Sequence, residues 1–205
     1  MPVYLLDILI NWHLKLNGRV IWQGALSAVF HVKSGVRQGG VLSPWFFNLY
    51  VNDLIVHLKL SGLGCYLSHV FVGCIFFADD ILLLSGSLLQ LQCMLDICYD
   101  YGLKFDILFN SDKSFLLQIG LVDHHSLPSL ALGLSCLKWV DKIKYLGVWI
   151  VAGKRFHVDC TLSRTKFLGA VFGVLQKCGG ISEEIKWNVL CHSCLPVLTY
   201  MVSTR

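Results

Sequence analysis

The chain has 205 residues, of which 55% are hydrophobic and 15% are charged, and this length suits one domain or one and a half. Its net charge of +4 is too mild to indicate nucleic acid by itself, and no apolar run is long and uninterrupted enough to span a membrane. The start shows no basic leader or cleavage site, and nine cysteines among apolar neighbours are typical of reduced core thiols, so we expect an intracellular protein, nuclear or cytoplasmic, that is not secreted.

One helix and two short strands are expected before a glycine-rich loop. Apolar spacing and turn signals place them at residues 3–16, 19–22 and 27–32. The loop, residues 35–44, has the sequence GVRQGGVLSP. Ser43 is a candidate N-cap and Pro44 a candidate first helical residue, so we expect a helix over residues 44–59. A loop of this kind can be a plain connection, and alone it is weak evidence of a ligand site.

Two adjacent carboxylates, Asp79 and Asp80, stand in a run that is otherwise apolar. Burying an unpaired charge costs several kcal/mol, so we do not expect a core to contain this pair without a partner or a function. We expect two strands within residues 70–84, with Ala78, Asp79 and Asp80 as the hairpin turn that lifts the carboxylates to the rim of a sheet. Two neighbouring carboxylates repel each other unless a cation neutralises them, and Mg²⁺ combines carboxylate and phosphate ligands. A plain solvent-facing turn is the alternative, since turns favour Asp.

Around this pair the pattern alternates between helix, strand and loop. The expected order is a loop at 61–70, a helix at 87–102, a strand at 104–109, a polar turn at 110–113, a strand at 114–119, a connector at 120–134 and a strand-like segment at 137–150. Ser87 is a candidate cap for the helix, and Gly102 a candidate end. The pair His124-His125 in the connector is expected to be simply exposed to solvent.

Two long helical stretches are expected near the end, at residues 157–177 and 183–201, separated by Gly179-Gly180. Pro196 inside the second predicts a kink. Residues 191–194, with the sequence CHSC, have metal-like spacing but no second pair of ligands nearby, so no zinc is expected.

Four blocks in this order and spacing resemble the reverse transcriptase of a non-LTR (LINE-type) retrotransposon. The blocks are GVRQGGVLSP at 35–44, FADD at 77–80, FNSDKS at 109–114 and YLG at 145–147. Each block alone is modest, whereas their order makes the set specific. The resemblance implies an α+β fold, in which a palm remnant (an antiparallel sheet with helices on one face) is followed by a helical thumb.

The resemblance divides the chain into partial fingers and palm at 1–150 and a truncated thumb-like segment at 151–205. It implies an RNA-directed DNA polymerase that uses two Mg²⁺ ions, an RNA template, a DNA primer and deoxynucleoside triphosphates, with no membrane. The implied catalytic and metal-binding residues are Asp79 and Asp80. The implied nucleotide- and template-binding residues are Arg37, Gln38, Gly39, Phe77 and Lys113, and the implied primer grip is Tyr145, Leu146 and Gly147.

One departure limits the resemblance. The family has a further metal-binding aspartate in a strand before the glycine loop, whereas the only carboxylate before Asp53 is Asp7, which lies in a helical pattern. We therefore expect a truncated copy of a retrotransposon reading frame, whose isolated chain is inactive because that aspartate and the fingers are missing. Two alternatives stay open: a catalytically dead remnant that binds nucleic acid, and a translated relic without function.

Overall fold

The computed structural model describes residues 2–33, 35–120 and 127–202. The chain forms two compact units, Met1–Leu91 and Gln92–Arg205, and the division falls inside helix α3 (Leu88–Phe105). Among the described helices, none combines the length and apolar character that crossing a membrane requires. The pair His124-His125 lies outside the described residues.

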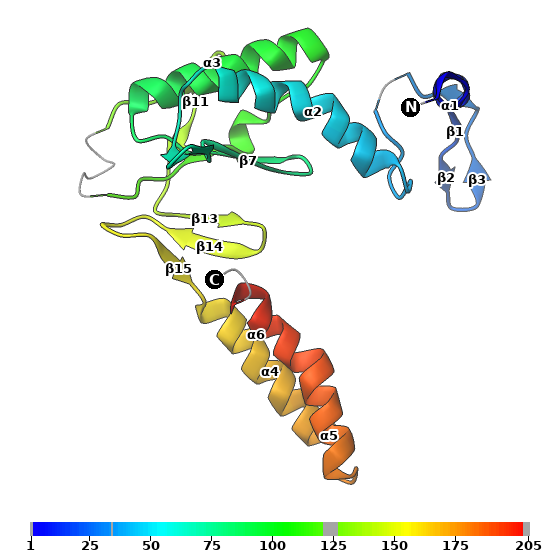
Figure 1. The fold of residues 1–205 in the computed structure, drawn as a ribbon. Helices are drawn as coiled ribbons and strands as arrows, with labels where there is room; N and C mark the ends of the chain where they lie inside the picture. Colours follow the sequence, from blue (N-terminus) through cyan, green and yellow to red (C-terminus); the bar gives the residue numbers. More distant parts are fainter. Residues whose placement is uncertain (1, 34, 121–126, 203–205) are drawn as a thin grey trace. The chain divides into compact units, whose positions relative to one another are not determined.

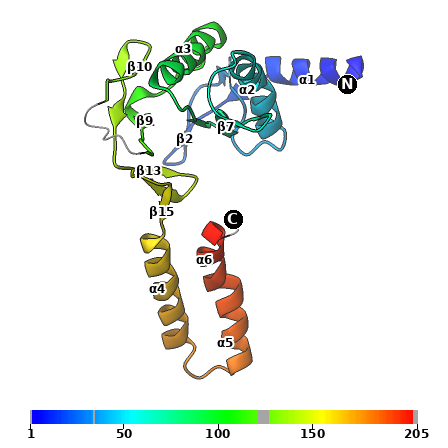
Figure 2. The same ribbon diagram turned by 60° about the vertical axis from the view of Figure 1, so that its left-hand side comes forward.

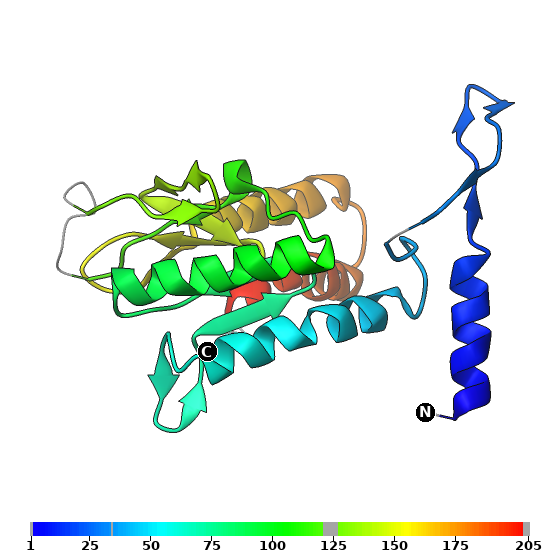
Figure 3. The ribbon, with the colours of Figure 1, turned by 90° about the horizontal axis from the view of Figure 1, so that it is seen from above.

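The first unit begins with helix α1 (Val3–Leu14), which confirms the first predicted helix. Two short antiparallel ladders follow, as Figure 3 shows: β1 (Asn17–Gly18) with β4 (Phe30–His31), and β2 (Ile21–Trp22) with β3 (Ala25–Leu26). Gln23 and Gly24 connect β2 to β3 with φ angles of 49° and 82°, the left-handed backbone that a two-residue hairpin turn requires. The predicted pair of strands is therefore present as four shorter ones.

Helix α2 (Ser43–Leu60) confirms the second predicted helix, but its start differs from the prediction. Leu42 occupies the N-cap position, and Ser43 does not cap the helix, because its hydroxyl donates a hydrogen bond back to the Arg37 carbonyl. Val51, Leu54 and Leu58 are buried at helical spacing and form the inward face of α2.

Two linked hairpins complete the first unit. They consist of β5 (Tyr66–Leu67) with β6 (Val70–Phe71), and β7 (Cys74–Phe77) with β8 (Asp80–Leu83). The loop expected at 61–70 therefore contains a hairpin, with Ser68 in the left-handed region at its turn (φ 56°). Backbone hydrogen bonds from Cys65 to Leu84 and from Leu84 to Gly73 join the two hairpins. Helix α2 runs along β7 and β8 (Figures 1 and 3).

The second unit contains most of α3, and this helix corrects the prediction of a strand at 104–109. The helix continues to Phe105, and Asp106 then reverses the chain with a φ angle of 54°. Gly102 permits the reversal, because a Cβ there would lie 2.5 Å from the Ile107 carbonyl oxygen. The Ile107 N–H donates to the Gly102 carbonyl at 2.9 Å and closes the C-terminal end of α3, so this segment ends a helix and does not join a strand ladder.

Short strands follow the 3₁₀ turn at Ser111–Lys113. β9 (Phe115–Leu116) pairs parallel with β12 (Lys138–Trp139), and β10 (Ala131–Leu132) pairs antiparallel with β11 (Ser135–Cys136). A three-stranded antiparallel sheet comes next: β13 (Lys142–Tyr145), β14 (Val148–Val151) and β15 (His157–Asp159). The helix expected from residue 157 therefore begins later, because residues 157–159 pair with β14.

The end of the second unit is a pair of antiparallel helical segments (Figures 1 and 2). They are α4 (Thr161–Lys177), and α5 (Glu183–Val189) joined through a π-helical turn (Leu190–Cys194) to α6 (Leu195–Val202). Pro196 has no N–H and cannot continue the α-helical ladder. The wider π turn lies just before it, so the irregularity expected at Pro196 takes this form.

The fold mixes helices with mostly antiparallel strands, which agrees with the expected α+β class. The resemblance also implies a palm sheet with helices on one face, and the structure does not confirm this sheet. Within the described ranges β7 and β8 form a sheet of two strands, and the one three-stranded sheet is β13–β14–β15.

Candidate functional site

The acidic pair lies at the end of the β7–β8 hairpin. Phe77 pairs with Asp80 in the antiparallel register, so Ala78 and Asp79 form a two-residue turn. Ala78 has a φ angle of 51°, as the first position of such a turn requires. The predicted hairpin is therefore confirmed with one correction: Asp80 is the first residue of β8 and not a turn residue.

Both carboxylates are exposed, so the hairpin avoids the cost of burying them. Successive residues of β7 alternate: Cys74 and Phe76 are partly buried, whereas Ile75 is 43% and Phe77 is 61% exposed. Because Asp80 lies opposite Phe77, the carboxylate of Asp80 and the Phe77 ring share the outward face of the hairpin. An aromatic surface therefore adjoins the acidic turn.

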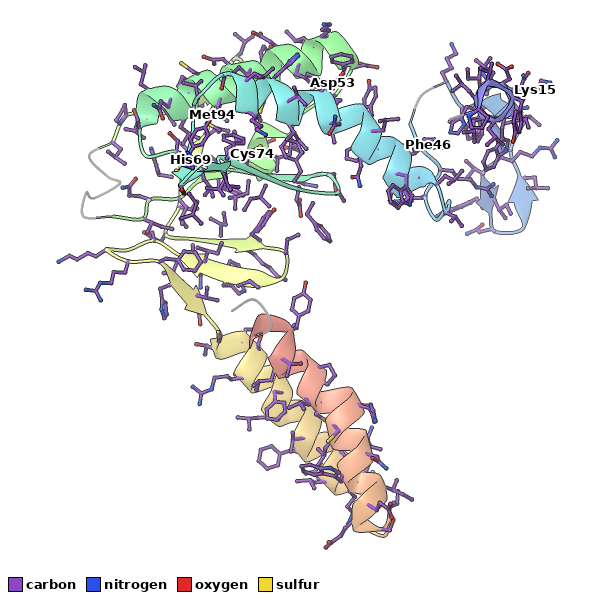
Figure 4. The ribbon with its side chains drawn as sticks, viewed as in Figure 1. Lys15, Phe46, Asp53, His69, Cys74 and Met94 are labelled. Atoms are coloured by element: carbon purple, nitrogen blue, oxygen red, sulfur yellow. The ribbon has the colours of Figure 1, made fainter. Side chains whose placement is uncertain are left out.

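The donor atoms at this turn suit Mg²⁺, which binds through one or two carboxylates together with phosphate and water. Within the described residues, neither Asp79 nor Asp80 has a hydrogen bond or an ion pair that would compete for those oxygens. No group of three His, Cys, Asp or Glu side chains among the described residues could hold a metal ion. Asp53, labelled on α2 in Figure 4, is exposed on that helix and does not form such a group with Asp79 and Asp80. The carboxylates at the acidic turn therefore come from the β7–β8 hairpin.

The glycine loop ends in a compact turn before α2. The Gly40 N–H donates to the Arg37 carbonyl at 3.1 Å, and the Ser43 N–H donates to the Gly40 carbonyl at 3.1 Å. A Cβ at Gly40 would lie 2.5 Å from the Ser43 hydroxyl oxygen and 3.1 Å from the Arg37 carbonyl oxygen, so a larger residue there would displace the Ser43 side chain and crowd the turn. Arg37, Gln38 and Gly39 are left exposed on the turn, where Gly39 has a φ angle of 78°.

The glycine loop and the acidic turn both belong to the first unit. The β7–β8 turn points towards the N-terminal half of α2, the end at which the glycine loop enters that helix (Figures 1 and 3).

The ring of Phe46 in this first part of α2 meets His13 of α1 edge-on, with centroids 5.2 Å apart. Figure 4 labels Phe46 there and Cys74 at the start of β7, where burial raises the pKa of the Cys74 thiol.

Lys113 is exposed on the 3₁₀ turn of the second unit. The Asn110 side-chain oxygen accepts hydrogen bonds from the N–H groups of Asp112 at 3.0 Å and of Lys113 at 3.2 Å. The Ser114 hydroxyl donates to the Asn110 carbonyl at 2.8 Å. Asn110 thus determines the backbone around Lys113, a role that its place as the first residue of the expected polar turn would have indicated.

The expected primer-grip residues are Tyr145, Leu146 and Gly147. Tyr145 is the last residue of β13, and Leu146 and Gly147 lie between β13 and β14. Leu146 and Gly147 form the two-residue turn, with φ angles of 47° and 84°. The Tyr200 hydroxyl of α6 donates a hydrogen bond to the Leu146 carbonyl at 3.0 Å. Sequence reasoning missed Tyr200, because no local pattern links residues so far apart along the chain.

Two further polar groups of the second unit are Asp159, before α4, and the cysteines of the CHSC segment. The hydroxyl and the backbone N–H of Thr161 bind Asp159 at the start of α4, and these hydrogen bonds lower the pKa of its carboxyl group. In the CHSC segment Cys194 is buried and Cys191 is partly buried, and both thiols are free. These two cysteines lie in the π-helical turn that precedes Pro196.

Residues 5–150 match the family described as reverse transcriptase (RNA-dependent DNA polymerase), and the chain therefore belongs to the reverse transcriptase family. It is 30% identical over 153 residues to the Retrovirus-related Pol polyprotein from type-2 retrotransposable element R2DM of Drosophila melanogaster, covering 71% of this chain and 14% of the relative. It is 23% identical over 176 residues to the Retrovirus-related Pol polyprotein from type-1 retrotransposable element R1 of Bradysia coprophila. This match covers 81% of this chain and 16% of the relative. These relatives confirm the LINE-type resemblance, and the chain spans a small part of their length.

Proposed function

We propose that this chain acts as part of an RNA-directed DNA polymerase, with partial fingers and palm at 1–150 and a thumb-like segment at 151–205. The acidic turn carries this proposal. Asp79 and Asp80 stand at the exposed end of a hairpin, inside the region that matches the family, and their oxygens are available to a cation. The proposed partners are an RNA template, a DNA primer and deoxynucleoside triphosphates.

Asp79 and Asp80 would hold Mg²⁺ together with the triphosphate. When bound, the metal neutralises phosphate charge and activates the primer hydroxyl. Phe77 lies beside Asp80 on the outward face and offers a flat apolar surface to a sugar or base. The exposed Gly39 lets the backbone approach a ligand closely, and the Arg37 guanidinium supplies a fork of donors that matches phosphate oxygens.

Phosphate contacts in the second unit would come from cationic side chains. Lys113 is exposed on its capped turn and is proposed to approach the triphosphate. The remaining contacts are proposed for the C-terminal basic group, which consists of Lys154, Arg155, Arg164 and Lys166. All four side chains are exposed, at the end of the three-stranded sheet and on the first turns of α4. Contacts of this kind bind nucleic acid without base specificity and weaken steeply with salt.

Metal-dependent binding of a triphosphate tests this function without requiring turnover. The chain is titrated with Mn²⁺, observed by electron paramagnetic resonance, in the presence of dTTP and primed poly-A RNA. We expect a bound Mn²⁺ that the double variant Asp79→Asn, Asp80→Asn loses. Asp53→Asn is the matched control, because Asp53 is an exposed aspartate on α2 and outside the hairpin.

Equal Mn²⁺ binding in all three proteins would refute the assignment of the metal site. Salt-dependent binding of primed RNA without any metal-dependent binding of triphosphate would identify a nucleic-acid-binding remnant in place of a polymerase. A chain that lacks a cooperative unfolding transition would point to a relic.

A further inference from the structure

Tyr200 connects the last helix to the turn between β13 and β14, within the second unit. Its hydroxyl donates to the Leu146 carbonyl at 3.0 Å across 54 positions of the chain. Its ring also lies against Gly147. A Cβ atom added to Gly147 would be 3.3 Å from the nearest ring carbon of Tyr200. Figures 1 and 2 show α6 ending close to the sheet that carries this turn.

The turn offers Tyr200 an acceptor that the sheet does not use. Tyr145 pairs with Val148, so the carbonyl of Leu146 lies outside the ladder at the end of the hairpin. Gly147 has a φ angle of 84°, and any side chain there would be strained by the backbone as well as crowded by the ring. Glycine at this position therefore serves both the turn and its contact with Tyr200.

The helical pair is attached to the three-stranded sheet through its chain connection and through Tyr200. The first is covalent: β15 leads directly into α4, where the Thr161 N–H donates to Asp159 at 2.9 Å. The second is the bond from Tyr200 at the far end of α6. Tyr200 is 61% exposed, so the directional hydrogen bond, and not burial of the ring, dominates this attachment.

We infer that Tyr200 is a positioning residue that couples the α4–α6 helical pair to the Tyr145–Gly147 turn. This inference rests on the proposed function, in which that turn contacts the primer end. A duplex that contacts the cationic first turns of α4 then also determines where the turn lies, because the helical pair and the turn move together. Tyr200 itself contacts neither nucleotide nor metal in this scheme.

The variant Tyr200→Phe keeps the ring and removes only the donated hydrogen bond. Thr199→Val is the matched control, since the Thr199 hydroxyl bonds within α6, to the Leu195 carbonyl. Hydrogen exchange of the amides at 145–148 reports the attachment directly. We expect exchange to be roughly two- to tenfold faster in Tyr200→Phe, as the loss of one hydrogen bond implies, and unchanged in Thr199→Val.

Fluorescence anisotropy then compares binding of a primed RNA with a recessed 3′ end and of a blunt duplex of equal length. We expect the wild type to prefer the recessed end, and Tyr200→Phe to lose this preference while binding the blunt duplex normally. Unchanged exchange in Tyr200→Phe overturns the attachment, and an unchanged preference overturns the positioning role. A wild type without any preference refutes the proposed role of the turn itself, and the exchange experiment still decides the attachment.

Discussion

Replacing Gln92 by alanine should release the β10–β11 hairpin from helix α3. The side-chain amide of Gln92 pairs with the backbone of Ala131, 39 positions away: Nε2 donates to the Ala131 carbonyl at 2.9 Å, and the Ala131 N–H donates to Oε1 at 2.8 Å. Each hydrogen bond contributes about 0.5–1.5 kcal/mol net, so losing both costs about 1–3 kcal/mol. Partial burial of the pair places the expected value in the lower half of this range.

Hydrogen exchange at the Ala131 amide measures this cost, because that N–H donates to the side chain which the substitution removes. A loss in the lower half of that range, about 1–2 kcal/mol, corresponds to exchange faster by about 5- to 30-fold. Gln92→Glu keeps the acceptor for Ala131 but loses the donor and places a charge near Asp96, so its effect should be intermediate. Gln90→Ala is the control. Unchanged exchange at Ala131 in Gln92→Ala would refute the reasoning.

Three further outcomes are expected. A polypeptide of residues 1–205 should not extend a primer on poly-A RNA with Mg²⁺ or Mn²⁺, because two metal ions need carboxylates from more than one strand. Primer extension that is abolished in the double variant Asp79→Ala, Asp80→Ala would contradict this expectation. Replacing the C-terminal basic group by glutamine should reduce the salt slope of log K for primed RNA by about three to four, and an unchanged slope would remove those residues from the interface. The lowered pKa of Asp159 means that its hydrogen bonds from Thr161 stabilise the fold above the ordinary value of 3.8 and stop doing so as the pH falls through the lowered folded-state value. The difference in melting temperature between the wild type and Asp159→Asn should therefore be largest above pH 3.8 and shrink as the pH falls below it, and a difference that does not shrink would show another origin.

The site was predictable from the sequence wherever its geometry depends on neighbours in the chain. Apolar strands on both sides of FADD form the hairpin because their partners are a few residues apart, which makes the loop between them inexpensive to close. The same holds for the turn that Asn110 caps ahead of Lys113. The family match could likewise be anticipated from four short blocks in order.

Errors arose where helix and strand compete for an apolar segment. Residues 104–109 have the composition of a strand, yet α3 extends to Phe105, whose ring contacts that of Tyr101 in a tilted arrangement with centroids 4.3 Å apart. Residues 157–159 fit a helical pattern but join β14 as a third strand. Short apolar runs suit both structures, so packing against the rest of the fold selects between them.

By itself, the sequence determined the family, the acidic hairpin, the glycine loop before α2 and the two-helix character of the end. Only the tertiary structure decided which distant groups meet: Gln92 with Ala131, β9 with β12, and Tyr200 with the Leu146 carbonyl. Each of these pairs a side chain or a strand with a backbone segment far along the chain. Periodicity describes which face of an element is apolar, but it carries no information on which remote backbone group that face will meet, because the fold as a whole brings the two together.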